Sequence, residues 1–435
     1  MLYIIVMGGH FMERKINLYL RKWKKDINRK PLLIYGNKQV GKTYTAIKFG
    51  EEEYKNIVYF NCENNMQLLN ILSREKTIDR IINKLNLLSS ETIIPNDTLI
   101  IFDNITEVEI VNGLRVFGKF DNPYHIIMIT SLKENLNRFK GEEFNFKAMF
   151  PMDFEEYLIA SDNSQLIDFI KTSFKNNSSM PFHSVAMEYF DDFVITGGMP
   201  EAVYIKVNKQ NNLFTMPVYN KILDSYKKEI GMLDNLIDIT RCNEVLDSIP
   251  LQLQKQNRKF QYGLIKLGSR SKDYEKSISF LHNNALAYKC YKISNIKSPL
   301  SSCKDPESFK LYMSDTGLLS YQLHLNRNKF LNDYNMKNLV YENCIAINLV
   351  NAGYGLYYYQ SEGKAEVSFV IQTRAGRIIP IELVNKNVSK SKSLTLFMNK
   401  FGVKDAIRVT EDNFSMKKGV KYIPIYALFC LADAI

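Results

Sequence analysis

The sequence has few of the features that mark disulfide-rich or zinc-binding proteins. Its six cysteines are scattered over 435 residues, none has a partner at Cys-x-x-Cys spacing, and the five histidines do not cluster near them. A zinc site and a disulfide framework are therefore disfavoured. Because scattered free cysteines are typical of a reducing compartment, we expect a cytoplasmic protein.

Long apolar runs are also absent. The apolar segments 1–7 and 422–429 are far too short to span a bilayer, which needs about 20 residues. The first lacks the basic start of a signal peptide, and the second is typical of a closing core strand. We therefore expect no membrane partner. An amphipathic segment runs from Met12 to Trp23, so we interpret Met12 as the natural start.

The composition is that of a globular protein, without repeats or a low-complexity linker, and the length predicts two to three domains. The formal net charge of +11 is compatible with DNA or with an acidic partner protein. A generally lysine-rich composition explains the charge equally well.

The most informative segment is a glycine-rich loop. A glycine, four free positions and Gly-Lys-Thr form the P-loop pattern, whose backbone N–H groups hold phosphate oxygens. The candidate cofactor-binding residues are Gly36, Asn37, Lys38, Gln39, Val40, Gly41, Lys42 and Thr43. Lys42 would reach the β- and γ-phosphates of ATP, and the Thr43 hydroxyl would ligate Mg²⁺. An apolar run precedes the loop and a helical pattern follows it, which is the context that the motif requires.

The loop lies in a region where strand-like and helical patterns alternate. Apolar runs at 32–35, 57–60, 99–102 and 125–129 alternate with helical spacing at 65–73, 77–88 and 107–117. This alternation predicts an α/β fold, with a parallel sheet and helices on both faces, over residues 12–150.

A second nucleotide-site residue is predicted at the end of the third run. Asp103 follows four apolar residues, and the carboxyl ends of parallel strands form the ligand-binding edge of such a sheet. Asp103 is therefore the candidate Mg²⁺ ligand and catalytic carboxylate. Asn104 stands where related ATPases have a glutamate; an amide orients water but accepts no proton, so we expect weak hydrolysis. Glu107 is an alternative base or an ordinary first-turn helix acid.

The fourth run ends in two hydroxyl residues. Thr130 or Ser131 is a candidate sensor of the γ-phosphate, and a plain strand-end turn is the alternative. Arg138 is a weak candidate for an arginine finger acting in trans, which would make the protein a homo-oligomer.

The remaining chain divides into three segments by pattern. Helical spacing dominates 151–240, where Asp153 and Glu156 fit a capping box. Segment 241–330 has a helix at 271–286 and a strand at 287–293, which is compatible with a winged helix. Segment 331–435 has a helix at 339–350, strands at 356–360, 366–372 and 377–383, a basic loop, a helix at 393–400 and two more strands.

Four motifs in this order resemble a known family. They are Gly36–Thr43 with the preceding strand, Pro-Met-Asp-Phe-Glu-Glu at 151–156, Gly-Gly-Met-Pro-Glu at 197–201 and Ser-Asp-Thr-Gly-Leu-Leu at 314–319. With them, nearly the whole chain from Arg14 resembles the bacterial and archaeal AAA-type ATPases that carry a C-terminal domain of unknown function. The resemblance implies an ATPase core, helical and winged-helix segments, and an end domain similar to restriction-type nucleases.

The resemblance also identifies a second potential catalytic site, in residues 331–435. Nucleases of this type bind Mg²⁺ through acids and use a lysine. Glu342 and Glu382 match the family pattern, but Ser368 stands at the aspartate position and Val384 at the lysine position. Lys386 and Glu366 are the candidate substitutes. We expect this nuclease site to be inactive.

The sequence thus favours a weak ATPase of the AAA type that controls a conformational change or assembly on DNA or a protein. A nucleotide-gated scaffold without useful hydrolysis and a residual metal-dependent nuclease are the alternatives. Cations that could contact DNA phosphates are Lys255, Arg258, Lys259, Lys266, Arg270, Lys272, Lys386, Lys390 and Lys392; solvated loops explain them nearly as well.

Overall fold

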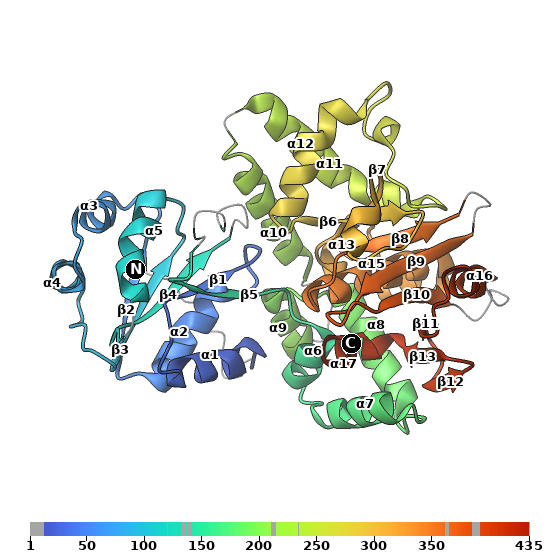
Figure 1. Cartoon of the computed structure of the whole chain (residues 1–435), viewed down its shortest axis with the longest axis horizontal. Helices are drawn as coiled ribbons and strands as arrows, with labels where there is room; N and C mark the ends of the chain where they lie inside the picture. Colours follow the sequence, from blue (N-terminus) through green and yellow to red (C-terminus); the bar gives the residue numbers. More distant parts are fainter. Residues whose placement is uncertain are drawn as a thin grey trace. The chain divides into compact units, whose positions relative to one another are not determined.

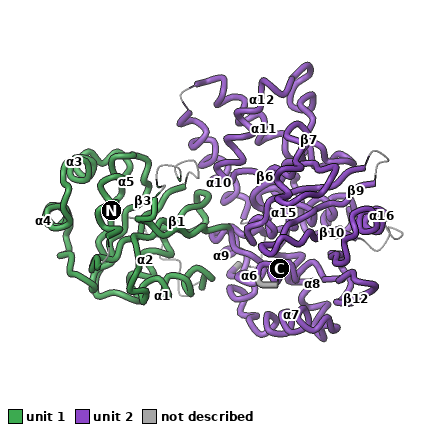
Figure 2. Tube along the Cα trace, viewed as in Figure 1, with its two compact units in different colours: residues 1–150 green, residues 151–435 purple. Residues whose placement is uncertain are grey.

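The computed structural model describes residues 13–119, 121–131, 136, 139, 141–209, 215–233, 235–361, 365–384 and 392–434. The chain forms two compact units, Met1–Phe150 and Pro151–Ile435, which Figure 2 colours separately. Met12, Arg138, Lys386 and Lys390 lie outside the described residues. Every helix in the described ranges is too short or too polar to cross a membrane.

The first unit contains a five-stranded parallel sheet in the order β2-β3-β4-β1-β5 (Figure 1). The strands are β1 (Leu32–Tyr35), β2 (Asn56–Asn61), β3 (Thr98–Asp103), β4 (His125–Thr130) and β5 (Asn145–Ala148). The helices are α1 (Ile16–Lys25), α2 (Lys42–Glu53), α3 (Met66–Arg74), α4 (Ile78–Leu88) and α5 (Val108–Leu114), followed by the 3₁₀ helix η1 (Arg115–Gly118). The predicted parallel α/β core is therefore confirmed.

Side chains that alternate along the strands build two cores in this unit. Val58 and Ile100 join a buried cluster with residues of α3, α4 and α5 on one face of the sheet. Ile57 and Leu99 lie against Gly50 of α2 on the other face. Because both faces are covered, the strands read as continuous apolar runs, which explains why the sequence predicts them well.

The second unit is built on an eight-stranded mixed sheet in the order β12-β13-β11-β10-β9-β8-β6-β7. Its strands are β6 (Ala287–Ile293), β7 (Lys304–Met313), β8 (Tyr357–Gln360), β9 (Glu366–Gln372), β10 (Ile378–Val384), β11 (Ala406–Thr410), β12 (Ser415–Lys417) and β13 (Val420–Pro424). The hairpin β6–β7 pairs through β6 with β8. Strands from both sides of residue 330 thus share one sheet, whereas the sequence suggests separate segments there.

Helices from the middle and the end of the chain surround this sheet (Figure 1). The first are α6 (Phe154–Ala160), α7 (Gln165–Asn176), α8 (His183–Thr196), α9 (Pro200–Lys209), α10 (Met216–Ile230), α11 (Leu236–Gln254), η4 (Tyr262–Leu264) and α12 (Ser271–Asn283). The others are η5 (Leu300–Cys303), α13 (Thr316–Gln322), α14 (Arg327–Asn332), α15 (Tyr334–Asn351), α16 (Lys392–Phe401), η6 (Ile425–Cys430) and α17 (Leu431–Ala434).

The structure corrects three strand expectations. The segment 422–429 is not one strand: β13 ends at Pro424 and η6 follows, since proline has no N–H for the ladder. Three strands rather than two follow α16. The sequence also does not predict β5, a short strand with largely half-exposed residues that extends the sheet beside β1.

The three family-like motifs of the second unit meet in one place. The N–H of Met152 donates to the carbonyl of Gly198 at 2.6 Å, and the N–H of Gly198 donates to the buried carboxylate of Asp315 at 2.7 Å. A Cβ on Gly198 would lie 2.1 Å from the carbonyl oxygen of Met152, so only glycine fits. Next to this joint, the capping box predicted at Asp153 and Glu156 is confirmed.

Candidate nucleotide-binding site

The predicted P-loop joins the end of β1 to the start of α2. Gly36 has φ of 153°, and a Cβ there would meet the carbonyl oxygen of Met149 at 2.0 Å. Gly41 is the N-cap of α2 with φ of 92°, and Gln39 is also left-handed with φ of 65°. The loop therefore requires glycine at the two motif positions. Since α2 begins directly behind it, the helix N-terminus adds N–H groups without intrahelical partners.

Lys42 lies folded onto its own loop. The side chain is buried, and its Nζ donates to the carbonyl oxygens of Gly36 at 2.8 Å and Asn37 at 2.7 Å. Asn37 and Val40 are buried, while Lys38 and Gln39 are half-buried. The predicted phosphate-binding lysine thus donates to two neutral carbonyls of its own loop.

Asp103 lies at the carboxyl end of β3, as predicted, and is the centre of the site. Its Oδ2 accepts hydrogen bonds from Thr43 Oγ1 at 2.6 Å and from the Tyr59 hydroxyl at 3.0 Å. Its Oδ1 accepts the N–H of Asn104 at 2.8 Å. Within the described residues, all three donors are neutral groups. The two predicted Mg²⁺ ligands, Thr43 and Asp103, are therefore adjacent.

Tyr59 is a site residue that the sequence analysis does not identify. Burial, followed by the charge of Asp103, raises the pKa of the Tyr59 phenol well above its usual range, so the group stays a donor. The register between β2 and β3 is what indicates Tyr59. Asn61 pairs with Asp103, and Tyr59 lies two residues before Asn61 on the same face of the strand.

Asn104 is exposed and occupies a left-handed conformation with φ of 55°. Its Nδ2 donates to Asn61 Oδ1 at 3.2 Å, so its amide lies at the ligand-binding edge of the sheet. Glu107, the alternative base, is exposed at the N-cap of α5, where Thr106 Oγ1 lies 3.4 Å from its carboxylate. No carboxylate thus stands at the position next to Asp103.

Thr130 ends β4 and is buried. Its Oγ1 donates to the carbonyl of Ile105 at 3.1 Å, which ties the end of β4 to the segment after β3. The adjacent Ser131 is half-buried.

Arg14 is a second residue that sequence reasoning missed. It lies before α1 and is buried, with Nη1 donating to the carbonyl of Val40 at 2.8 Å and Nη2 donating to that of Phe150 at 2.9 Å. One guanidinium thus joins the P-loop to the last residue of the first unit. These contacts span 26 and 136 residues, so no local pattern indicates them.

The acids of the second predicted site are held by cations. Glu342 is buried on α15 and accepts hydrogen bonds from the Tyr312 hydroxyl at 2.6 Å and from Lys310 Nζ at 3.3 Å; it also pairs with Arg258. Burial alone would raise the pKa of Glu342, but Arg258 and Lys310 lower it to about 2. Arg258 is therefore occupied here, contrary to the expectation that it faces phosphates.

Glu366 meets Glu342 at the ammonium group of Lys310, so a cation already lies between these two acids. Glu366 Oε1 accepts from Lys310 Nζ at 2.6 Å, and Glu382 Oε2 accepts from Arg408 Nε at 3.1 Å. Ser368 and Val384 are half-buried. Among the described residues, no three His, Cys, Asp or Glu side chains are grouped so that they could hold a metal ion.

A parallel sheet with a glycine loop after β1 and a carboxylate at the end of β3 defines a P-loop nucleotide-binding domain. Residues 28–158 match the family model described as AAA domain, which supports an AAA-type ATP-binding domain over this part of the chain. Residues 187–329 and 337–428 match two models described as Domain of unknown function, DUF8612 and DUF4143. Among curated proteins, none is significantly similar in sequence.

Solved structures show weak similarity over most of the chain. The Aeropyrum pernix ORC1 protein in complex with DNA is 13% identical, with 78% of this chain and 95% of that chain covered and a TM-score of 0.32. A STAND protein with a tetratricopeptide repeat sensor from Pyrococcus horikoshii is 14% identical, with 78% and 45% covered and a TM-score of 0.28. Drosophila ORC bound to DNA is 12% identical, with 73% and 95% covered and a TM-score of 0.25.

Proposed function

We propose that the protein is an ATP-controlled switch, in which Mg²⁺ and ATP bind the first unit and binding changes how the chain leaves that unit. The observation that carries the proposal is Arg14, which joins the P-loop carbonyl of Val40 to the carbonyl of Phe150. The AAA domain match supports ATP as the nucleotide.

The first step concerns Lys42. A phosphate would compete for its ammonium group, because a charge-assisted hydrogen bond is stronger than one to the neutral carbonyls of Gly36 and Asn37. The loop N–H groups would then hold phosphate oxygens. Thr43 and Asp103 would hold Mg²⁺, which neutralises phosphate charge when bound.

The second step is transmission along the chain. Release of Lys42 from its two carbonyls changes the loop that contains Val40, and Arg14 connects this loop to Phe150. Two residues after Phe150, Met152 forms a hydrogen bond with Gly198, and Gly198 forms one with Asp315 in the second unit. A change in the P-loop would therefore act on the short segment that leads into this joint.

We propose that hydrolysis is slow. Asn104 can orient a water molecule through its amide, but it accepts no proton, and Glu107 is exposed at the start of α5. Comparison of ATP turnover with an Asn104→Glu variant separates a slow ATPase from a scaffold that never hydrolyses ATP. Slow but measurable turnover by the unchanged protein supports the slow ATPase, and turnover that is seen only in the variant supports the scaffold. Brisk turnover by the unchanged protein contradicts the proposal of slow hydrolysis.

The nuclease-like segment is proposed to be inactive, because Lys310 and Arg408 already neutralise Glu342 and Glu382. Metal-dependent DNA cleavage that disappears in a Glu382→Ala variant would contradict this proposal.

The switch is tested by ATP titration together with hydrogen exchange of residues 149–153 and 196–200. Lys42→Ala should weaken ATP binding about a hundredfold or more, roughly 2.7 kcal/mol. Arg14→Gln should retain ATP binding but lose the ATP-dependent change in exchange, and Arg21→Gln on the more exposed surface of α1 is the matched control. Unchanged ATP affinity in Lys42→Ala refutes the site; an unchanged exchange response in Arg14→Gln refutes the transmission.

A further inference from the structure

The chain has a basic stretch in each unit, and the one in the second unit has more exposed cations. Residues 14–30 contain eight basic and one acidic residue, but only Lys22 and Lys25 among the eight are exposed. Residues 255–276 contain seven basic and two acidic residues, a net charge of +5 against +11 for the whole chain. Arg258 is half-buried and paired with Glu342. The exposed cations of the stretch are Lys255, Lys266, Arg270, Lys272 and Lys276. A density of exposed positive charge of this kind is typical of a surface that binds a polyanion.

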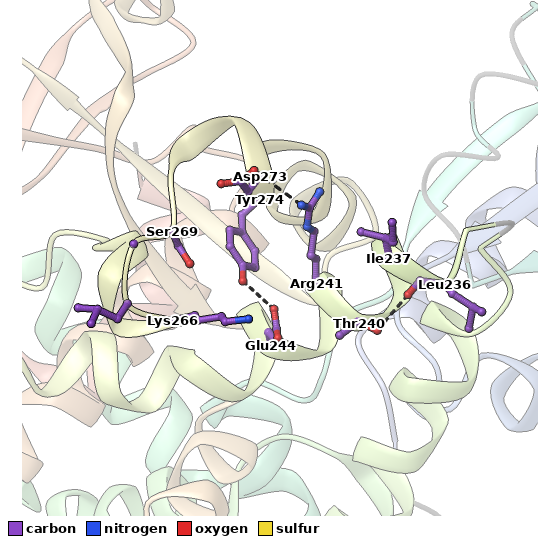
Figure 3. A pocket seen from close by; sticks show the side chains of 11 residues that line it. Leu236, Ile237, Thr240, Arg241, Glu244, Lys266, Ser269, Asp273 and Tyr274 are labelled. Carbon is purple, nitrogen blue, oxygen red and sulfur yellow. Dashed lines mark hydrogen bonds and ion pairs between the residues drawn. The ribbon is translucent and has the colours of Figure 1, made fainter.

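Two acids close to these cations, Glu244 and Asp273, already have partners. They line a cavity of about 470 Å³ between α11 and the start of α12 (Figure 3). In its wall, the Tyr274 hydroxyl donates to Glu244 at 2.7 Å, and Arg241 lies 3.7 Å from the Asp273 carboxylate (Figure 3). Glu275 is the exposed acid that remains on α12.

Helix α12 has one buried and one charged face. Tyr274, Ile278 and Leu281 are buried, whereas Lys272 and Lys276 are exposed one turn apart and lie on a common face. The helix follows η4 and a turn at Gly268, which has φ of 82°. Helix α12 packs on α11 and keeps its lysine face exposed. An exposed helix is the element that helix-turn-helix proteins place in the DNA major groove.

The hairpin that follows α12, β6–β7, is part of the large sheet, unlike the hairpin of an isolated winged helix. β6 pairs with β8 inside the large sheet, and the loop between β6 and β7 is fixed to β9, because the N–H of Leu300 donates to Gln372 at 2.7 Å. Contacts to a partner would therefore fall on α12 and on the turn before it, not on the hairpin.

We infer that α12 and the preceding turn form a docking surface for duplex DNA, with Lys266, Arg270, Lys272 and Lys276 against the phosphates. This inference names the partner of the proposed switch and so rests on that proposal. Duplex DNA fits better than other nucleic acids, since its major groove admits an α-helix whereas that of RNA is deep and narrow. A single strand needs aromatic side chains for stacking, and here Tyr274 and Phe260 are buried while Tyr262 is half-buried against Phe260.

The test uses the full chain and a fluorescein-labelled duplex of about 30 base pairs, three helical turns, titrated over a range of salt concentrations. The triple variant Lys266→Glu, Arg270→Glu, Lys272→Glu should weaken binding at least tenfold and reduce the salt slope by about 3, one for each lost phosphate contact. Glu275→Lys should strengthen binding and steepen the slope, which a loss of fold cannot do.

The matched control carries the same change of net charge on exposed lysines elsewhere in the second unit: Lys404→Glu, Lys417→Glu, Lys418→Glu. It should bind almost as tightly as the unchanged protein. Equal losses in both triple variants, or no DNA binding by the unchanged protein, overturn the inference, and a preference for acidic protein over DNA does the same. Titrations without nucleotide and with Lys42→Ala keep this result separate from the ATP switch, because they measure DNA binding when no nucleotide is bound.

Discussion

Asp103 and Glu342 are both buried acids in motifs that predict a metal site, and their surroundings differ in one respect. Asp103 accepts hydrogen bonds from the neutral donors Thr43, Tyr59 and the Asn104 N–H. Glu342 is surrounded by the cations Lys310 and Arg258. A carboxylate that is bonded only to neutral donors keeps its negative charge for a metal ion, so the first site suits Mg²⁺. The charge of Glu342 is already neutralised by Lys310 and Arg258. The partners of an acid, rather than the acid itself, thus decide whether a motif is competent.

The largest expected effect follows from removing the cation between Glu342 and Glu366. A Lys310→Met variant leaves the buried Glu342 and the half-buried Glu366 without their shared ammonium group. We expect the free energy of unfolding of the second unit to fall by about 3–5 kcal/mol. Urea unfolding followed by far-UV circular dichroism measures it, and the exposed Lys404→Met is the control. A loss within about 0.5 kcal/mol of that control would mean that Lys310 does not compensate these acids.

The next effect is a pH dependence of the same cluster. The folded pKa of Glu342 is about 2, below its ordinary value of 4.5, so the unfolded chain binds the proton more readily. The stabilisation is therefore complete above about pH 5 and is lost as the pH falls towards 2, with an upper limit of about 3 kcal/mol. Unfolding at several pH values should show that the difference between the unchanged protein and Glu342→Gln shrinks over this window. A difference that is constant from pH 6 to about pH 3 contradicts this assignment, while the exposed Glu307→Gln should follow the unchanged protein.

The sequence predicts the strands of the first unit because they are buried on both faces and form uninterrupted apolar runs. It also predicts Asp103 beside the P-loop, since the chemistry of a parallel sheet edge follows from strand direction. It does not predict β5, whose half-exposed residues carry no apolar run, nor the contacts of Arg14, which reach across 26 and 136 residues. The sequence also does not predict the role of Lys310. This residue comes from β7, far from Glu342 in the sequence, and the nuclease motif specifies the acids but not the cations that pair with them.

The contrast between Asp103 and Glu342 is tested most directly by a variant that removes the charge of Asp103 and keeps the shape of its side chain. In Asp103→Asn, an amide oxygen can still accept the hydroxyls of Thr43 and Tyr59, so the fold should persist. The variant lacks the charge for Mg²⁺, and we expect the gain in ATP affinity that Mg²⁺ provides over EDTA to fall about tenfold, or roughly 1.4 kcal/mol. ATP titrations in the two buffers measure this, with Glu342→Gln as the control that leaves the gain unchanged. If Asp103→Asn retained the full Mg²⁺ effect, or Glu342→Gln lost it, the neutral donors around Asp103 would not distinguish a metal site from a compensated one.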